Sequence, residues 1–293
     1  MNFTGIHTAL ITPFKNGKID AAAYRSLIDR QIAAGITGIV PVGTTGESPT
    51  LDTGEHIEVI RLAVEFAAGR CLVIAGTGAN STAEAIELTQ AAEVAGANGS
   101  LQVCPYYNKP SQEGLYLHFK AIAASTSLPI MLYSVPGRSG IEIAPETAAR
   151  LAADCQNITS IKEAGGSVDR VNLLVQALPQ GFGILSGDDP LTVPFIAAGA
   201  NGLVSVASNL IPEIMTQLVN HCLSGEFAAA LALHKTYYPL MRGLMSLDVN
   251  PVPIKTAVAL QGHCESELRL PLAPMSEANL TALRLLLRTY SLI

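Results

Sequence analysis

The chain has 293 residues, of which 49% are hydrophobic and only 14% charged, and its formal net charge is -6 at pH 7. Its lysines and arginines are scattered singly and form no basic stripe that could follow a phosphate backbone, so we expect no nucleic-acid partner. No apolar run approaches the roughly 18 residues that a membrane span needs, and the N-terminal MNFTGIHTAL lacks a basic leader. These features predict a cytoplasmic protein without a membrane partner, and the low charged fraction favours a homo-oligomer.

The cysteines indicate neither a disulfide framework nor a zinc site. Their number is odd, their spacing is wide, and each lies in an apolar context: Cys71, Cys104, Cys155, Cys222 and Cys264. Cysteines of this kind are typical of buried, reduced thiols.

Apolar segments rich in β-branched residues alternate with segments of helical period up to about residue 224. The segments that we interpret as strands are 7–12, 38–43, 71–78, 100–105, 130–135, 158–164, 183–187 and 202–208. Their near-continuous apolar character is typical of parallel strands buried on both faces, so the pattern predicts an α/β fold, a (β/α)8 TIM barrel. An open doubly wound sheet is the alternative.

Local signals support the helices between these strands. Pro145 precedes an apolar stripe, and Ser81 with Glu84 fits a capping box. Pro41 lies inside the second strand, where it cannot donate to the sheet, so we expect a bulge there.

The strand pattern stops after residue 225, where only helical segments follow. These segments are 227–245, 253–262 and 277–290. We therefore predict two regions, a catalytic barrel over residues 1–224 and a C-terminal helical region over residues 225–293.

Polar side chains follow the predicted strands where each strand ends. In a TIM barrel the active site gathers at the carboxyl ends of the strands. The residues at those ends are Thr44, Thr45, Thr77, Tyr106, Tyr107, Tyr133, Arg138, Lys162, Asp188, Asp189 and Ser205. The six histidines lie elsewhere, which disfavours a histidine-bound metal.

We expect no cofactor. The glycine-rich turn GTGAN at residues 76–80 lacks the spacing of a dinucleotide or nucleotide loop. Asp188 and Asp189 would repel a phosphate at the position where barrels often bind one.

Lys162 is the remaining nucleophile, at the end of the apolar strand in NITSIKEAGG, residues 157–166. A lysine amine held in the mouth of a barrel can condense with a ketone to form a Schiff base. Two other interpretations stay open: Lys162 could extend into water or pair with the adjacent Glu163, and Tyr133 could simply cap the core.

Four motifs carry a resemblance to a known family. They are GTTGES at 43–48, YYNKPSQEGLYLHF at 106–119, YSVPGRSG at 133–140 and IKEAGG at 161–166, with further matches in LSGDD and LRLPLAP. The chain resembles the dihydrodipicolinate synthases, within the N-acetylneuraminate lyase superfamily, nearly from end to end. The resemblance implies a lyase that condenses pyruvate with L-aspartate 4-semialdehyde to give 4-hydroxy-tetrahydrodipicolinate, the first committed step of lysine and diaminopimelate biosynthesis.

The resemblance also implies a role for each matching residue. Lys162 would form the Schiff base, Tyr133 would transfer protons at the imine, and Thr44 and Tyr107 would connect Tyr133 to solvent, with Tyr107 contributed across a subunit interface. The substrate-binding residues would be Thr45 for the carboxylate of pyruvate, Arg138 for that of the aldehyde, and the backbone of Gly187 and Val204. No metal or cofactor is implied.

Regulation and assembly follow from the same resemblance. Many members are inhibited by lysine, and the matching allosteric positions are Ser48, His56, Asn80, Glu84 and Tyr106. A dimer would be the smallest active unit, and a dimer of dimers, a homotetramer, is expected.

Four positions depart from the family pattern. Ser134 and Gly165 lie within two of these motifs, and Thr53 and Pro49 lie near the allosteric positions. Two rival functions remain: a pyruvate-dependent aldolase for a sugar acid, and a non-catalytic barrel that senses a keto acid.

Overall fold

The computed structural model describes residues 3–293, and within them eight parallel strands close into a barrel. The order around the barrel is β1-β10-β9-β8-β7-β6-β5-β4, and β1 closes it by pairing with β4, with His7 opposite Gly38. The strands are β1 Gly5–Ala9, β4 Gly38–Val40, β5 Leu72–Gly76, β6 Gly99–Val103, β7 Ile130–Ser134, β8 Ile158–Glu163, β9 Gly183–Ser186 and β10 Gly202–Ser205. The predicted (β/α)8 barrel is confirmed, and each strand lies within or beside its predicted segment.

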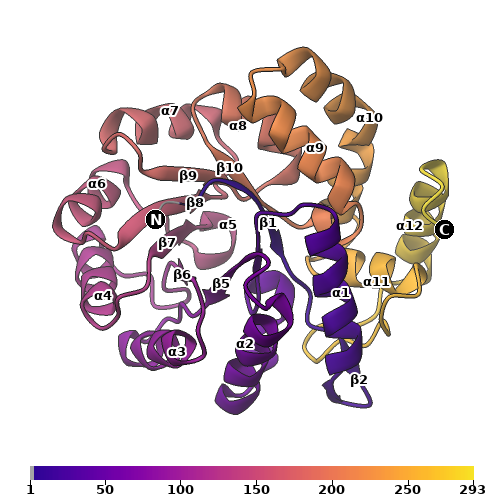
Figure 1. Ribbon diagram of the computed structural model, residues 1–293, viewed down its shortest axis with the longest axis horizontal. Coiled ribbons are helices and arrows are strands. Elements are labelled where there is room, and N and C mark those ends of the chain that lie inside the picture. Colours follow the sequence, from indigo (N-terminus) through magenta and orange to yellow (C-terminus); the bar gives the residue numbers. More distant parts are fainter. Residues whose placement is uncertain (1–2) are drawn as a thin grey trace.

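Helices surround the barrel and continue beyond it at the C-terminus (Figure 1). They are α1 Ala21–Ala33, α2 Thr53–Ala67, α3 Thr82–Val94, α4 Gln112–Ala124, α5 Pro136–Ser139, α6 Pro145–Asp154, α7 Val168–Ala177, α8 Thr192–Ala197, α9 Pro212–Leu223, α10 Phe227–Ser246, α11 Val252–Leu260 and α12 Glu277–Thr289. Four short 3-10 helices also follow strand ends: η1 Thr44–Gly46, η2 Ser48–Thr50, η3 Asp189–Leu191 and η4 Ala207–Asn209.

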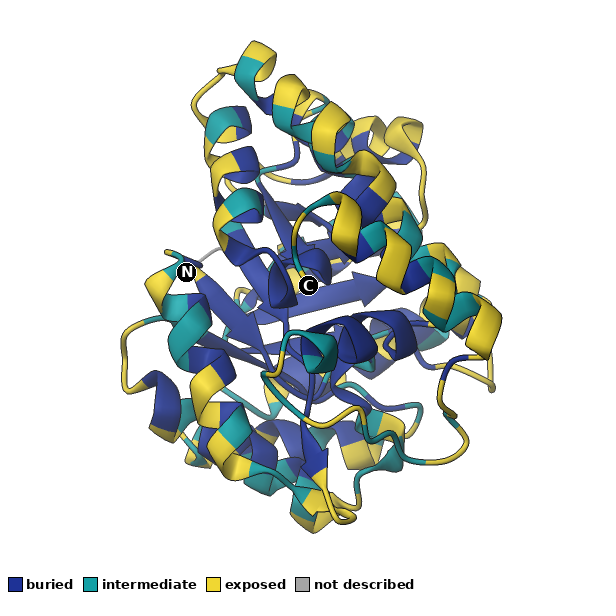
Figure 2. Ribbon diagram, turned by 90° about the vertical axis from the view of Figure 1, so that its right-hand side faces the viewer, coloured by how far each residue is buried: buried dark blue, intermediate teal, exposed yellow. Residues whose placement is uncertain are grey.

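The core lies inside the barrel and between the barrel and its helices. Figure 2 shows the barrel strands as almost entirely buried, whereas the helices alternate buried and exposed faces. This difference is the reason for the two sequence periods, because a strand covered on both sides is apolar at every position and a surface helix only along one stripe.

The local helix signals are largely realised. Pro145 is the first residue of α6, which buries Ala148 and Leu151. The side chain of Ser81 accepts a hydrogen bond from the backbone N of Glu84 at 3.5 Å, but the complete reciprocal capping box forms elsewhere, between Asp52 and Glu55 at the start of α2.

The bulge expected at Pro41 is wrong. Strand β4 ends at Val40, so Pro41 lies outside the sheet and its missing N–H breaks no ladder, while its carbonyl accepts from the N of Gly76 at 3.0 Å. The barrel has its register shift instead between β7 and β8, at Ile130 and Met131.

A small hairpin, not predicted from the sequence, precedes α1. Strands β2 Phe14–Lys15 and β3 Lys18–Ile19 pair antiparallel around Asn16 and Gly17, which have φ of 54° and 77°. Two consecutive left-handed residues are typical of a type I′ turn, and Asn-Gly was the available signal.

The C-terminal region is helical as predicted, with α10, α11 and α12 packed at one side of the ring of barrel helices (Figure 1). The division of the chain at residue 224 stays a prediction. Within residues 3–293, no helix is both long and apolar enough to cross a membrane.

Candidate active site

Neighbouring strands place Tyr133 and Lys162 side by side. Tyr133 on β7 is in register with Lys162 on β8, and both residues are only 6% exposed. The amine nitrogen of Lys162 lies 4.1 Å from the centroid of the Tyr133 ring. Since the ring face attracts a cation, the amine has a fixed position above the ring.

Glu163 is directed away from Lys162. Successive side chains of a strand point to opposite faces, and the fully buried Glu163 accepts from Nε of Arg170 at 2.7 Å and from the N of Gly165 at 2.6 Å. Burial raises the pKa of the Glu163 carboxyl, an effect that Arg170 opposes. Among residues 3–293 no carboxylate lies within ion-pair distance of the Lys162 amine, so the alternative of a Lys162–Glu163 ion pair is wrong.

Lys162 opens into an inner cavity of about 110 Å³ at the mouth of the barrel. Thr44, Thr45, Tyr133 and Gly187 also line this cavity. A Cβ atom at Gly187 would lie 3.0 Å from Cε of Lys162 and 2.7 Å from Cβ of Ala164, so a larger residue there would displace the lysine stem.

Val204 is fully buried in β10 and is not part of this cavity wall. The strand ends at Ser205, the backbone then turns into a helical conformation, and Val206 lines the cavity.

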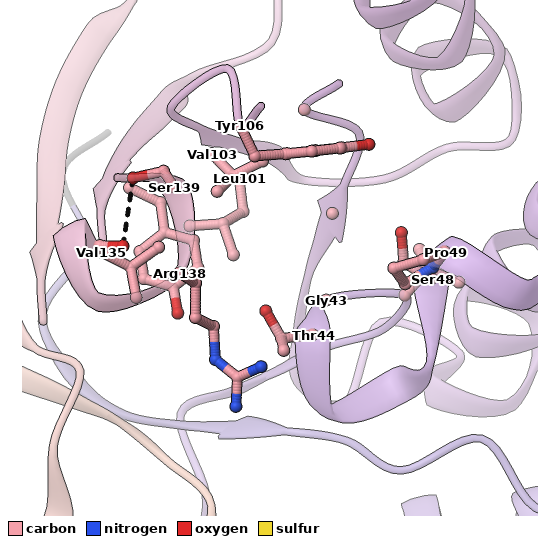
Figure 3. A pocket seen from close by; sticks show the side chains of 14 residues that line it. Gly43, Thr44, Ser48, Pro49, Leu101, Val103, Tyr106, Val135, Arg138 and Ser139 are labelled. Carbon is pink, nitrogen blue, oxygen red and sulfur yellow. Dashed lines mark hydrogen bonds between the residues drawn. The ribbon is translucent and has the colours of Figure 1, made fainter. Parts of the chain in front are cut away.

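An outer cavity of about 220 Å³ adjoins the inner one (Figure 3). In Figure 3 Arg138 and Thr44 lie on one side below Tyr106, and Ser48 lies across the cavity from Val135. Thr44, Tyr133 and Arg138 line both cavities, so these three residues form the boundary between them.

Asn250, which precedes α11, completes the inner cavity and was not predicted as a site residue. Its side-chain Nδ2 donates to Oγ1 of Thr45 at 3.1 Å, and its backbone carbonyl accepts from Nη2 of Arg138 at 3.1 Å. The available signal was the NP.PIK stretch of the otherwise helical C-terminal region.

Tyr107 is not brought to the cavities. It is 92% exposed and has a left-handed backbone with φ of 73°, which is uncommon for a bulky residue. The strained loop therefore presents a large aromatic side chain to the outside of its own chain.

The predicted allosteric residues fall into two groups. Ser48 and Tyr106 line the outer cavity, and the amide of Asn80 donates to the carbonyl of Tyr106 at 3.2 Å. His56 on α2 is buried, with Nε2 at 2.8 Å from the carbonyl of Gly76, and burial lowers its pKa. Glu84 lies in the first turn of α3, and its charge adds to the burial that raises the pKa of Tyr106.

The two aspartates at the end of β9 differ in environment. Asp188 lines the inner cavity. Asp189 is 3% exposed and accepts from the Ser205 hydroxyl and from the N of Val206 and Ala207 at 3.0 and 2.9 Å. Burial raises the pKa of Asp189 to about 6 in spite of these bonds. In residues 3–293 no group of three or more histidine, cysteine or acidic side chains is arranged to hold a metal.

A closed barrel with a buried amine among hydroxyl groups at its mouth is the arrangement expected of a lyase that uses lysine. The family model described as "Dihydrodipicolinate synthetase family" matches residues 2–290, and the chain belongs to this family.

Individual relatives match over nearly their whole length. The chain is 50% identical over 292 residues to a protein of Persephonella marina named 4-hydroxy-tetrahydrodipicolinate synthase, covering 99% of each sequence. The solved structure of the enzyme of that name from Methylacidiphilum fumariolicum SolV is 57% identical, has a TM-score of 0.97, and is matched over 98% of this chain and 95% of that one. A solved structure from Cyanidioschyzon merolae, described as having lysine bound, is 40% identical with a TM-score of 0.96 over 99% of each chain.

Proposed function

We propose that this chain condenses pyruvate with L-aspartate 4-semialdehyde to form 4-hydroxy-tetrahydrodipicolinate through a Schiff base on Lys162. The observation that carries the proposal is the buried amine of Lys162, which has no carboxylate partner among residues 3–293 and opens into a cavity beside Tyr133. Family membership and relatives named for this reaction support the choice of substrates. The product feeds lysine and diaminopimelate biosynthesis, which agrees with the expected cytoplasmic location.

The covalent steps balance without an added reagent. The amine of Lys162 adds to the ketone carbon of pyruvate and one water leaves, which gives an iminium ion that draws electrons from the neighbouring methyl carbon. Loss of a proton from that carbon gives an enamine, which bonds to the aldehyde carbon while the aldehyde oxygen takes up a proton. The amino group of the aldehyde substrate then replaces Lys162 at the imine carbon, which closes the ring and restores the free amine.

Hydroxyl groups would move the protons in these steps. Tyr133, whose ring holds the lysine amine, would exchange a proton at the imine, and Thr44, which lines both cavities, would pass it toward solvent. Thr45 would bind the carboxylate of pyruvate, and the backbone of Gly187 would complete the pocket. The hydrogen bond from Asn250 to Thr45 supports that orientation.

Arg138 would select the second substrate. A guanidinium group binds a carboxylate with two parallel hydrogen bonds, and the carboxylate of aspartate semialdehyde lies at the end of the molecule away from the reacting aldehyde. Replacing Arg138 by Ala should raise the KM for the aldehyde about 10- to 100-fold, the range for a lost hydrogen bond to a charged group. Initial rates with aspartate semialdehyde, N-acetylmannosamine and small sugar aldehydes separate this function from that of a sugar-acid aldolase.

Assembly belongs to the same proposal. Tyr107 is exposed on a strained loop, as expected for a side chain that inserts into the cavity of a second subunit. The active unit would then be a dimer, and two dimers would form a tetramer. Light scattering combined with activity at decreasing protein concentration tests this, and a fully active monomer would contradict it.

Lysine is the proposed regulator. A relative has been solved with lysine bound, and Ser48, Tyr106 and Asn80 lie together at the outer cavity here. We expect millimolar lysine to lower the initial rate, and Glu84→Gln to weaken that inhibition with little effect on the uninhibited rate. An uninhibited wild-type enzyme would exclude the regulatory role of these residues, with His56 among them.

Borohydride trapping tests the central step. Reduction in the presence of pyruvate should fix the three-carbon unit on Lys162, which mass spectrometry of the digested protein locates. If the protein instead binds pyruvate without an adduct, the keto-acid sensor is the better function.

A further inference from the structure

Glu47 has an unusual backbone for its residue type. It joins η1, which carries Thr44 and Thr45, to η2, and its φ of 58° and ψ of 34° are left-handed. Glycine or asparagine adopts this conformation more easily, whereas a glutamate there is strained. The strain indicates that the Glu47 side chain is held by its surroundings.

Two groups from the C-terminal region hold the Glu47 carboxylate. Oε1 accepts from Nζ of Lys255 on α11 at 2.6 Å, and Oε2 accepts from the backbone N of Arg269 at 3.2 Å. Both side chains of the Glu47–Lys255 pair are completely buried. Burial lowers the pKa of Lys255, and the Glu47 charge opposes that shift, so each charge depends on the other for its burial.

The ring of Phe14, in strand β2 of the hairpin, packs against the Glu47–Lys255 pair. The amine of Lys255 and the guanidinium carbon of Arg269 lie 4.1 and 4.3 Å from its centroid. The position of Lys255 is therefore fixed by a carboxylate at one end and an aromatic face beside it.

The same C-terminal segment also holds the turn at Thr45. Asn250, five residues before Lys255, donates to Oγ1 of Thr45 at 3.1 Å. On the opposite side, Oγ1 of Thr12 donates to the carbonyl of Gly46 at 2.7 Å. Since Glu47 follows directly after Gly46, the ion pair anchors the exit of the turn in which Thr44 lines both cavities and Thr45 lines the inner one.

We propose that Glu47 and Lys255 are positioning residues that set the orientation of Thr44 and Thr45 in the active site. The proposal rests on the function assigned to those two threonines. The pair touches no substrate and acts through the backbone of residues 44–47. A hydrophobic pair of similar volume would fill the same space, but only the ion pair fixes the direction of the Glu47 side chain.

The test compares Lys255→Met, Glu47→Gln and the double variant Glu47→Gln/Lys255→Met. Each single change leaves a polar or charged group without its partner in a buried place, so we expect a lower melting temperature. The double variant removes both charges, so we expect it to regain most of that loss. Its KM for pyruvate should nevertheless stay raised and its kcat lowered by about 10- to 100-fold, the range for a misplaced catalytic group.

Leu287→Ala is the matched control. Leu287 is fully buried in α12, so its truncation lowers the melting temperature without touching the turn. We expect unchanged kinetic constants for the folded fraction. A merely structural role of the ion pair predicts the same for the double variant.

Three results decide the proposal. A double variant with a near wild-type melting temperature and wild-type KM and kcat overturns it, and a raised KM with Lys162 still trapped by borohydride supports it. Should the double variant not fold, the KM of Glu47→Gln decides in the same way. Failure of wild-type Lys162 to be trapped with pyruvate would refute the proposed function instead.

Discussion

Two buried lysines have similar surroundings in different regions of the molecule. Lys162 ends a barrel strand and Lys255 lies in helix α11 of the C-terminal region, and their residues are 6% and 0% exposed. Each amine lies 4.1 Å from an aromatic centroid, that of Tyr133 or of Phe14. The anion makes the difference: Lys255 has Glu47 at 2.6 Å, whereas within residues 3–293 no carboxylate pairs with Lys162.

The comparison separates a structural from a reactive use of the same side chain. A buried ammonium is costly to remove from water unless an anion and hydrogen bonds compensate. Lys255 is compensated, and its donor is already occupied. Lys162 lacks this compensation and opens into a cavity, which leaves its nitrogen free to bond to a ketone carbon.

Borohydride trapping with pyruvate is the most direct test of the difference in reactivity between Lys162 and Lys255. Lys162→Ala should abolish the pyruvate adduct and reduce turnover to background, because Lys162 is the one lysine among the described residues that line the inner cavity. Lys255→Met should keep the adduct. Mass spectrometry after borohydride reduction measures both.

Labelling at Lys255 in the wild-type protein would contradict the assignment. Circular dichroism of each variant is the control, since a misfolded variant also loses its adduct. Lys255→Met is the variant at greater risk, because it leaves Glu47 buried and unpaired.

Tyr133 tests whether the ring beside Lys162 does more than hold the amine. Tyr133→Phe keeps the ring face but removes the hydroxyl, so some adduct should still form. Turnover should fall roughly 10²- to 10⁴-fold, the usual contribution of a general acid or base. Single-turnover rates measure the effect, and wild-type turnover would exclude the proton relay.

The barrel could be predicted because its information is local. Each strand is covered on both faces and reads as a short apolar run, so eight runs separated by helical stripes define the closed sheet. The error at Pro41 also has a local cause, since β4 stops after Val40 and the apolar run continues past the end of the sheet.

The candidate site was predictable only in part. Lys162 and Tyr133 lie at strand ends, where the fold itself brings side chains together. Asn250 and the Glu47–Lys255 pair depend on a segment about 200 positions away, because Glu47 and Lys255 are separated by 208 residues. No periodicity encodes a contact over that distance, although a single lysine inside the apolar PVPIKTAVAL is the same kind of signal that pointed to Lys162.

His7 is a third buried base and, like Lys162, it has no carboxylate partner among residues 3–293. It is fully buried in β1, and burial lowers its pKa to about 4. Because the unfolded chain takes up a proton near pH 6.5 and the folded chain does not, stability is lost as the pH falls from about 6.5 to 4. The full loss is about 3 kcal/mol, at 1.36 kcal/mol for each pKa unit.

His7→Gln should remove this dependence while keeping a donor toward the carbonyl of Thr4, which the His7 ring approaches at 3.1 Å. Urea unfolding from pH 7 to 4 measures it. Asp189, with its raised pKa, acts in the opposite direction over the same range, so the difference between wild type and variant is the quantity to compare. Parallel curves would mean that His7 is not held neutral.

The smallest expected effect concerns Glu55. Its carboxylate binds the guanidinium of Arg269 near the surface, whereas the backbone N of Arg269 donates to Glu47. Oε1 of Glu55 accepts from Nη2 of Arg269 at 2.7 Å, and the Arg269 bond lowers the pKa of Glu55. Glu55→Gln removes only the charge and keeps the capping box, because the side-chain oxygen of Gln can also accept from the backbone N of Asp52. We expect a loss of about 1 kcal/mol or less at pH 7, because solvent screens a partly exposed pair.

This difference should shrink as the pH falls through the pKa of the folded Glu55, where the wild-type carboxylate also becomes neutral. Urea unfolding at pH 7 and pH 3 tests the prediction, with KM for pyruvate as the second measurement. A wild-type KM in Glu55→Gln beside a raised KM in Glu47→Gln would mean that the buried Glu47–Lys255 pair sets the orientation of Thr44 and Thr45. An equal rise in both would assign that control to the Arg269 cluster as a whole.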